Sequence, residues 1–219
     1  MIPSAVLFDC DGVVVDSEGE AFSLLGQELG AAGLSLDHAE MERLFLGGTV
    51  AGLYAKARDL GADLPDTWVE DFYQRLYARL RLGVALVPGI TLVLARLQAA
   101  GVPFAMGSNG SDEKMAITLG QHPAVRTAFG KHLYSGQTLG RPKPAPDLYL
   151  HAAAQLGADP ACAVVIEDSA TGARAARAAG MRCYGYAPPG ATKAAGQALQ
   201  AEGAILFADM ADLPGLLGV

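Results

Sequence analysis

Two aspartates, Asp9 and Asp11, follow the apolar run 5–8 and are themselves followed by Gly12. In open α/β sheets, ligands bind at the carboxyl ends of the strands, so both carboxylates would point into a site. Carboxylates in such a place act as nucleophiles, as general acids and bases, or as ligands of hard cations. Because Asp and Gly also end many strands in a simple turn, the motif needs support from elsewhere in the chain.

A second acidic pair, Glu167 and Asp168, follows the apolar run 163–166 and precedes Ser169, a predicted helix N-cap. Either residue on its own could serve to cap that helix. At one edge of a parallel sheet, however, this pair and the pair Asp9 and Asp11 would repel each other unless a cation lay between them. Oxygen ligands without a neighbouring His or Cys favour Mg²⁺. The sequence therefore predicts a Mg²⁺ site at this edge.

Two further segments offer groups that bind phosphate. Ser108 and Asn109 lie between glycines after the apolar run 102–106, and supply a hydroxyl, an amide and free backbone N–H groups. Lys143 lies between Pro142 and Pro144, whose rings restrict the backbone that presents its ammonium group. Taken singly, these are a polar turn and a surface lysine. Beside a predicted metal site, they indicate a phosphorylated ligand.

The four motifs in this order resemble the haloacid dehalogenase (HAD) superfamily: DCDG at 9–12, Ser108, Lys143 and the pair 167–168. More narrowly, the chain resembles the branch with a helical cap after the first motif, which contains sugar-phosphate phosphatases and β-phosphoglucomutases. The segments SNGSDEKM (108–115) and LYSGQTLGRPKPAPDLYLHAA (133–153) are similar to small bacterial phosphatases that act on phosphogluconate-like substrates and sugar phosphates. The resemblance covers essentially the whole chain.

The resemblance implies a role for each motif. Asp9 would be the nucleophile that forms an aspartyl-phosphate, and Asp11 the general acid and then the base. Mg²⁺ would be held by Asp9, the backbone carbonyl of Asp11, and Asp168, with Glu167 contributing as in some relatives. The phosphoryl oxygens would be held by Ser108, Asn109 and Lys143. The implied function is Mg²⁺-dependent hydrolysis of a sugar phosphate or a phosphogluconate-like metabolite.

The elements that must position these residues alternate between strand and helix. Apolar runs without polar alternation predict strands that are buried on both faces, as in a parallel sheet. Such runs occur at 5–9, 102–108, 163–168, 182–186 and 204–207, with a weaker one at 132–135. Helical patterns separate them at 89–100, 147–156 and 170–179. This order predicts a doubly wound α/β sheet, the Rossmann-like core of the superfamily.

The stretch 17–87 interrupts that alternation. Its apolar residues recur at helical spacing, as in Leu25 and Leu29 or Phe72 and Leu76, and no strand is expected in it. Some 70 residues are too many for one crossover, so we expect an inserted all-helical cap over 17–87. Residues 1–16 and 88–219 would form the α/β core, with 87–89 as the return hinge. The cap would select the substrate, although nothing in it spells out a ligand.

Composition limits the partners. The 219 residues are 51% hydrophobic and carry 16 Lys and Arg against 23 Asp and Glu, a net charge of −7. We therefore expect no nucleic-acid partner. No apolar run reaches a membrane span, and the first residues lack the features of a signal peptide. Three scattered cysteines suit a reducing compartment. We expect a cytoplasmic enzyme, monomer or small homo-oligomer, whose partner is a small phosphate ester.

Other functions fit less well. The mutases that this chain resembles carry a His in the first cap helix, where Ala21 stands here, and an Arg in a cap loop that here reads GGTV (47–50). A phosphate-storing signalling domain would need no helical insertion. A cysteine phosphatase using Cys10 would need an Arg in its phosphate loop, but residue 16 is Asp. Dehalogenation is disfavoured because Asp11 and the metal carboxylates serve phosphate chemistry.

Overall fold

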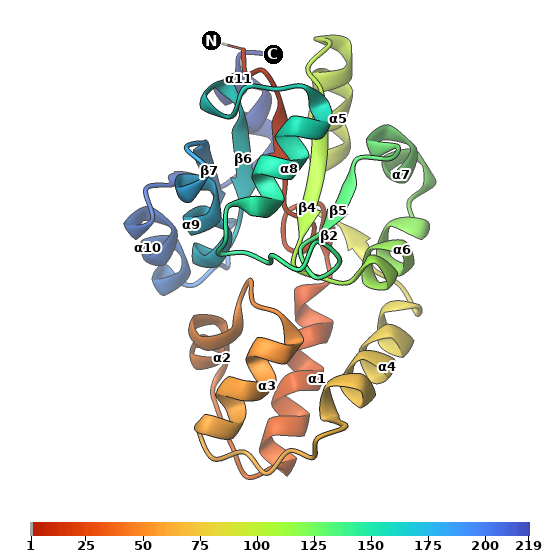
Figure 1. The fold of residues 1–219 in the computed structure, drawn as a ribbon, viewed down its shortest axis with the longest axis vertical. Helices are drawn as coiled ribbons and strands as arrows, with labels where there is room; N and C mark the ends of the chain where they lie inside the picture. The colour runs from red at the N-terminus through yellow and green to blue at the C-terminus, as the bar shows by residue number, and fades with distance from the viewer. Residues whose placement is uncertain (1) are drawn as a thin grey trace.

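The fold is built on a six-stranded parallel sheet. In the computed structural model, which describes residues 2–219, the strands run in the order β5-β4-β1-β6-β7-β8 (Figure 1). The central strand β1 pairs with β4 on one side and β6 on the other. The bounds are β1 Val6–Phe8, β4 Phe104–Ser108, β5 Leu133–Ser135, β6 Val164–Glu167, β7 Arg182–Tyr186 and β8 Ile205–Phe207. Each lies in a predicted run, and the doubly wound parallel sheet is confirmed.

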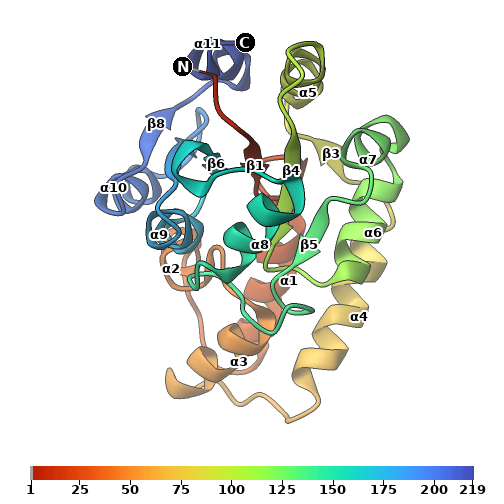
Figure 2. The same ribbon diagram turned by 45° about the horizontal axis from the view of Figure 1, so that its top comes forward.

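Helices cover both faces of this sheet (Figure 2). Along β1, Val6 and Phe8 join one hydrophobic cluster and Leu7 joins another, so the strand is buried on both sides. One face carries α8 (Asp147–Leu156), α9 (Ala170–Ala178) and α10 (Lys193–Ala201); the other carries α5 (Ile90–Ala99), α6 (Asp112–Gly120), α7 (Pro123–Phe129) and α11 (Leu213–Leu217). Short 3₁₀ turns lie at Pro160–Cys162 and Met210–Asp212.

The predicted helices of the core begin and end close to where the sequence indicates. Helix α8 spans the predicted residues and ends at Gly157, whose φ of 67° is the left-handed conformation of a helix C-cap. Helix α9 begins after Ser169, whose side chain accepts a hydrogen bond from the backbone N–H of Gly172. The start of α9 lies at the carboxyl edge of the sheet, directly after Glu167 and Asp168, whereas the end of α8 leads back to the amino end of β6.

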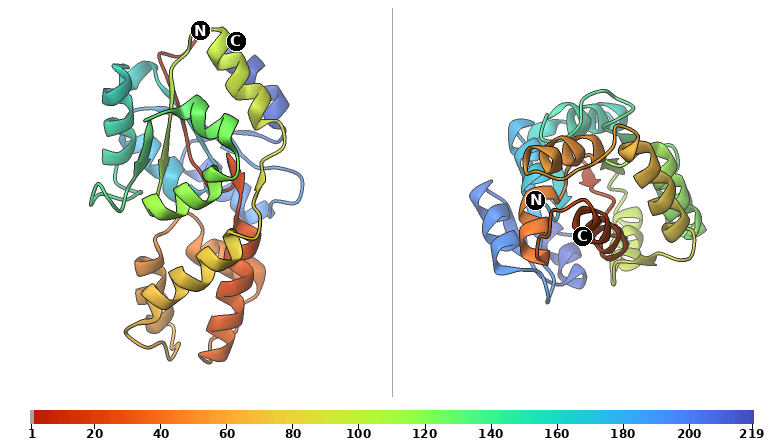
Figure 3. Two further views of the ribbon diagram at one scale, coloured as in Figure 1. Left: turned by 90° about the vertical axis from the view of Figure 1, so that its right-hand side faces the viewer. Right: turned by 90° about the horizontal axis from the view of Figure 1, so that it is seen from below.

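Four helices are inserted between the first strand and the rest of the sheet, and they lie below it in Figure 1 and in the left view of Figure 3. Asp37 begins α2 with a capping box formed with Glu40, and Thr49 caps α3. Leu25 of α1 and Leu76 of α4 are buried where these helices meet. The helices are α1 Glu18–Ala31, α2 His38–Phe45, α3 Val50–Asp59 and α4 Trp68–Leu80. The inserted all-helical cap is thus confirmed.

A two-stranded antiparallel sheet forms the neck between cap and core. Strand β2 (Val15–Asp16) pairs with β3 (Ala85–Leu86). The expectation of no strand within 17–87 is therefore wrong at 85–86. Strands of two residues are too short to show any periodicity, so the sequence pattern gave no sign of them. The domain boundaries at 16/17 and 87/88 stay a prediction, and we propose that the neck is where the two parts hinge.

Polar contacts join the cap to the core. Asn109 donates from Nδ2 to the backbone carbonyl of Gly47 at 2.9 Å, and Gln137 donates from Nε2 to the hydroxyl of Tyr73 at 2.8 Å. Further away, Thr192 donates to Glu42 at 2.8 Å. These contacts hold the cap over the carboxyl edge of the sheet.

Among residues 2–219, no helix is both long enough and apolar enough to cross a membrane.

Candidate active site

Three of the predicted acidic residues lie together at the carboxyl edge of the sheet. Asp9 follows β1, Glu167 ends β6 and Asp168 follows it, and one oxygen from each lies within 4.8 Å of the others. Gly12 lets the first loop pass close to this group: a Cβ on it would lie 2.0 Å from Oδ2 of Asp168, and its φ of +75° is also unfavourable for other residues. The arrangement concentrates negative charge where a cation would relieve the repulsion.

Lys143 is the buried counter-charge of this group. Its Nζ lies 2.5 Å from Oδ1 of Asp9 and 2.6 Å from Oε1 of Glu167. Burial raises the pKa of Asp9 to about 7; Lys143 lowers it, whereas the charges on Glu167 and Asp11 raise it. Although burial lowers the pKa of Lys143, the two carboxylates outweigh that effect and hold it above its usual range. One ammonium group therefore does not neutralise the site.

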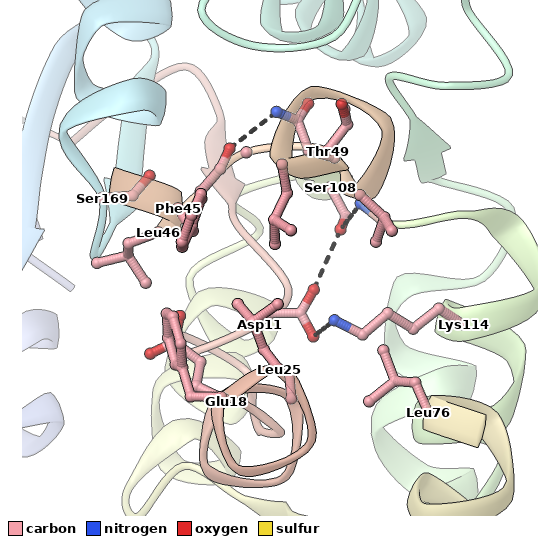
Figure 4. Close-up of a pocket in the computed structure, with 18 of the residues that line it drawn as sticks. Asp11, Glu18, Leu25, Phe45, Leu46, Thr49, Leu76, Ser108, Lys114 and Ser169 are labelled. Carbon is pink, nitrogen blue, oxygen red and sulfur yellow. Dashed lines mark hydrogen bonds and ion pairs between the residues drawn. The ribbon is translucent and has the colours of Figure 1, made fainter. Parts of the chain in front are cut away.

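Asp11 faces a different environment. Its Oδ1 lies 2.7 Å from Nζ of Lys114 and accepts a hydrogen bond from Ser17, while its Oδ2 lies 3.5 Å from Oγ of Ser108 (Figure 4). Burial would raise the pKa of Asp11, but Lys114 and the Ser17 hydrogen bond hold it below its usual value. The Asp11 carboxylate thus contacts Lys114, Ser17 and Ser108, and it lines a cavity beneath the cap.

The other predicted phosphate ligands lie next to these carboxylates. Ser108 ends β4 and is buried, and its Oγ accepts a hydrogen bond from the backbone N–H of Gly110 at 2.9 Å. Asn109 donates from Nδ2 to the backbone carbonyls of Gly47 and Lys143, and its Oδ1 accepts from the N–H of Lys143. Both Nδ2 hydrogens are therefore used in holding the Lys143 loop and the cap. That Asn109 binds phosphate stays a prediction, and the group available for it is the backbone N–H rather than the side chain.

Glu167 is fully buried, and its oxygens accept five hydrogen bonds. Oε1 accepts from Lys143 and, at 2.7 Å, from the hydroxyl of Tyr149; Oε2 accepts from the backbone of Asp168 and from the backbone and hydroxyl of Ser169. Gly172 makes room for this carboxylate, since a Cβ on it would lie 1.7 Å from Oε1. Glu167 thus fixes the position of Lys143.

Sequence reasoning missed Lys114, Ser17 and Tyr149. A signal for Lys114 exists, because it stands in the first turn of α6, where the helix dipole disfavours a cation. A lysine in that place needs another partner, and here the partner is Asp11. Glu18 is partly buried beside the site, and burial together with the charges of Asp11 and Asp9 raises its pKa to about 8.

A cavity of about 130 Å³ lies between the sheet edge and the cap. Asp9, Asp11, Ser108, Lys143 and Asp168 line its core side. The cap side is built mainly from apolar side chains, and Figure 4 shows four of them around the space that Asp11 faces: Leu25, Phe45, Leu46 and Leu76. The cavity thus combines a charged floor with an apolar roof.

Comparisons with known proteins agree with this geometry. The chain is 31% identical over 185 residues to the 6-phosphogluconate phosphatase of Escherichia coli, covering 82% of this chain and 80% of that protein. It is 29% identical over 184 residues to the bifunctional riboflavin kinase/FMN phosphatase of Arabidopsis thaliana, but spans about half of that longer relative, 48%.

A solved structure of a HAD family hydrolase from Deinococcus radiodurans, with bound phosphate and sodium, is 37% identical and superposes with a TM-score of 0.78. The match covers 98% of this chain and 95% of that one. The family model described as haloacid dehalogenase-like hydrolase matches residues 3–180, which include every acidic group of the site. The chain therefore belongs to the haloacid dehalogenase-like hydrolase family.

Proposed function

We propose that this protein is a Mg²⁺-dependent phosphatase that hydrolyses small phosphorylated metabolites through an aspartyl-phosphate on Asp9. The observation that carries the proposal is that two carboxylates line one cavity and that each contacts a different lysine. Asp9 is buried against Lys143 beside Asp168, and Asp11 is held by Lys114 facing the leaving-group side. A nucleophile and a residue that acts as general acid and base need such different environments.

In the first step, an oxygen of Asp9 attacks phosphorus and the bond to the substrate oxygen breaks, while Asp11 gives its proton to the departing alkoxide. In the second step, Asp11 takes a proton from water, whose oxygen attacks phosphorus and releases Asp9 and inorganic phosphate. Lys114 favours the ionised form of Asp11, which suits the second step. For the first step, we propose that the substrate phosphate draws the Lys114 ammonium away, so that Asp11 can carry a proton.

The residues present suit a magnesium ion. Three carboxylates with oxygens within 4.8 Å form a hard-oxygen donor set, and their charge exceeds what Lys143 balances. We propose that Asp9 and Asp168 hold the ion, with Glu167 beside it holding Lys143. Bound Mg²⁺ would neutralise charge on the phosphoryl group. The remaining phosphoryl oxygens would be bound by Ser108, Lys143 and the backbone N–H of Asn109.

Hydrolysis is supported over phosphoryl transfer to a second sugar oxygen. Ala21 and the segment 47–50 line the cavity, in the places where the resembling mutases carry a His and an Arg. The methyl side chain of Ala21 can neither transfer a proton nor hydrogen-bond a phosphosugar, as a His in its place could. The relative named as a 6-phosphogluconate phosphatase favours the same reaction, and the substrate in its own name is a sugar-acid phosphate.

The test is phosphate release from an aryl phosphate, with Mg²⁺ and with excess EDTA. We expect turnover that EDTA abolishes and that Mg²⁺ restores. Asp9→Asn should be inactive, while Asp59→Asn, on the exposed end of α3, should match the wild type. Full turnover in EDTA, or in Asp9→Asn, would refute the site as described.

A further inference from the structure

The roof of the cavity is apolar. It is formed by side chains from all four cap helices and from the segment after α2: Ala21, Phe22, Leu25, Phe45, Leu46, Val50, Leu53, Phe72 and Leu76. From this lining we propose that the natural substrate is a monophosphate whose leaving group has a compact apolar body, an aryl, cycloalkyl or branched alkyl group, rather than a row of hydroxyls. The inference rests on the proposed phosphatase function and narrows its substrate class.

Few polar groups of the cap face the cavity. They are Glu18, Thr49 and Tyr73. The hydroxyl of Thr49 already accepts a hydrogen bond from the backbone N–H of Gly52 at 3.1 Å, and that of Tyr73 accepts one from Gln137 at 2.8 Å. The charged groups of the floor are engaged with one another and with the phosphoryl position. The body of the leaving group could therefore hydrogen-bond only to the Glu18 carboxyl and to the O–H groups of Thr49 and Tyr73, since the other cap side chains that line the cavity are apolar.

A polyhydroxylated leaving group would therefore be poorly matched. A sugar brings several hydroxyls that are hydrogen-bonded in water, and each one buried without a partner gives up those hydrogen bonds without replacement. Against Leu25, Phe45 and Leu76, such hydroxyls would meet only carbon. An apolar body loses nothing on leaving water and gains contact with the same side chains.

The size of the cavity limits the body further. Its volume of about 130 Å³ is close to that of an apolar protein cavity of about 150 Å³ that takes up benzene. The phosphoryl group lies toward the floor, between Ser108 and Lys143. Because the phosphoryl group takes part of the same volume, the remainder suits a short branched chain, and a ring would need the cap to move outward. A long acyl chain or a nucleoside would exceed it.

The experiment compares pairs of substrates with equal attachment and different polarity. Cyclohexylmethyl phosphate and glucose 6-phosphate both place the phosphate on a primary carbon outside a six-membered ring, so their leaving groups differ mainly in hydroxyls. Isobutyl phosphate and glycerol 1-phosphate form a smaller pair. For each pair we expect kcat/KM to be at least about 10-fold higher for the apolar member, the scale of discrimination that an apolar pocket achieves.

A matched pair of variants locates the preference. Leu53 lines the roof and is only partly buried, so Leu53→Gln should leave the fold intact and reduce the apolar preference several-fold. Leu60, at the opposite end of the same helix, is 46% exposed and lies outside the cavity, so it provides the control Leu60→Gln, which should keep the wild-type ratio.

The outcomes separate the two proposals. Preference for the apolar member, reduced in Leu53→Gln alone, supports the inference. Equal rates or a preference for the sugar, with Mg²⁺-dependent turnover, would overturn the inference and leave the phosphatase function standing. No phosphate release from any member, nor from an aryl phosphate, would overturn the function and the inference with it.

Discussion

Asp9 and Asp11 are two residues apart in the chain, yet their carboxylates meet opposite environments. Burial and neighbouring carboxylates raise the pKa of Asp9 to about 7, whereas Lys114 and Ser17 overcome burial and lower the pKa of Asp11. Lys143 acts on Asp9 and Lys114 on Asp11, so each carboxylate has its own ammonium partner. We propose that this pairing assigns the nucleophile and the acid–base role.

Lys114 should set the pH profile through Asp11. In Lys114→Met, burial acts on Asp11 without its counter-charge, so the pKa of Asp11 should rise. Because the water-attack step needs ionised Asp11, the acidic limb of the kcat profile should move to higher pH. Lys114→Arg keeps the charge and should keep the limb near its wild-type position. A profile unchanged in Lys114→Met would show that Lys114 does not act on Asp11.

The carboxylates also predict how stability depends on pH. Burial raises the pKa of Asp9 to about 7 and that of Glu18 to about 8, while both titrate near 4 in an unfolded chain. The folded state thus holds these protons more tightly, so the free energy of unfolding of the metal-free protein should fall as the pH rises from about 4 to about 8.

Magnesium binds ionised carboxylates, so it should counteract that loss. We expect added Mg²⁺ to raise the Tm more at about pH 8 than at about pH 5.5, as measured by scanning calorimetry with and without EDTA. An equal or smaller rise at the higher pH would be inconsistent with a metal site made of Asp9 and Asp168.

At the scale of elements, the first turn of α9 is shaped around Glu167. Gly172 is buried there, and a Cβ on it would collide with the Glu167 carboxylate. Gly172→Ala should therefore cost about 1–3 kcal/mol of stability and lower activity, because displaced Glu167 no longer holds Lys143. Gly30→Ala in α1 meets nothing within 4 Å and should instead stabilise by about 0.5–1 kcal/mol. Urea unfolding of both variants measures the difference, and equal effects would contradict this account.

The sequence predicted elements well where a single pattern dominates. The six core strands and helices such as α8 are continuous apolar runs or 3.6-residue repeats that end at Gly or Pro, and the structure has them within a few residues. The neck strands β2 and β3 could not be predicted, because their two-residue pairing depends on segments some 70 residues apart.

For the site, the sequence predicted the charged residues on the core side of the cavity but not the apolar residues on its cap side. Asp9, Asp168 and Lys143 follow strands or lie between prolines, so their convergence follows from the topology. No sequence pattern distinguishes the apolar lining. Leu25 and Leu76 have the spacing of core residues in a helical bundle, and they line a cavity only because the cap packs on the sheet. The place of Lys114 in the first turn of α6 indicates that it needs a partner, but only the packing of α6 beside the loop after β1 shows that this partner is Asp11.

At the scale of the whole molecule, the α/β core and the helical cap contribute different groups to the cavity. The sheet edge supplies all the charged groups that would act on phosphorus, and the cap supplies the wall against which the leaving group would lie (Figures 1 and 4). The contacts of Gly47 and Tyr73 with the core hold the cap against this edge of the sheet. We propose that movement about the neck admits substrate and that closure excludes bulk water from the aspartyl-phosphate.

The most direct test of the proposed mechanism is to trap the phosphoenzyme in the intact protein. A phosphoryl-labelled aryl phosphate is mixed with the enzyme and Mg²⁺, quenched in acid within milliseconds, and the label on protein is counted. Wild type should carry transient label and Asp9→Asn none. Asp11→Asn should keep the nucleophile and hold its label longer, because loss of a positioned base slows the water attack by about 10²–10⁴-fold. Label on Asp9→Asn would contradict the assignment of Asp9 as the nucleophile.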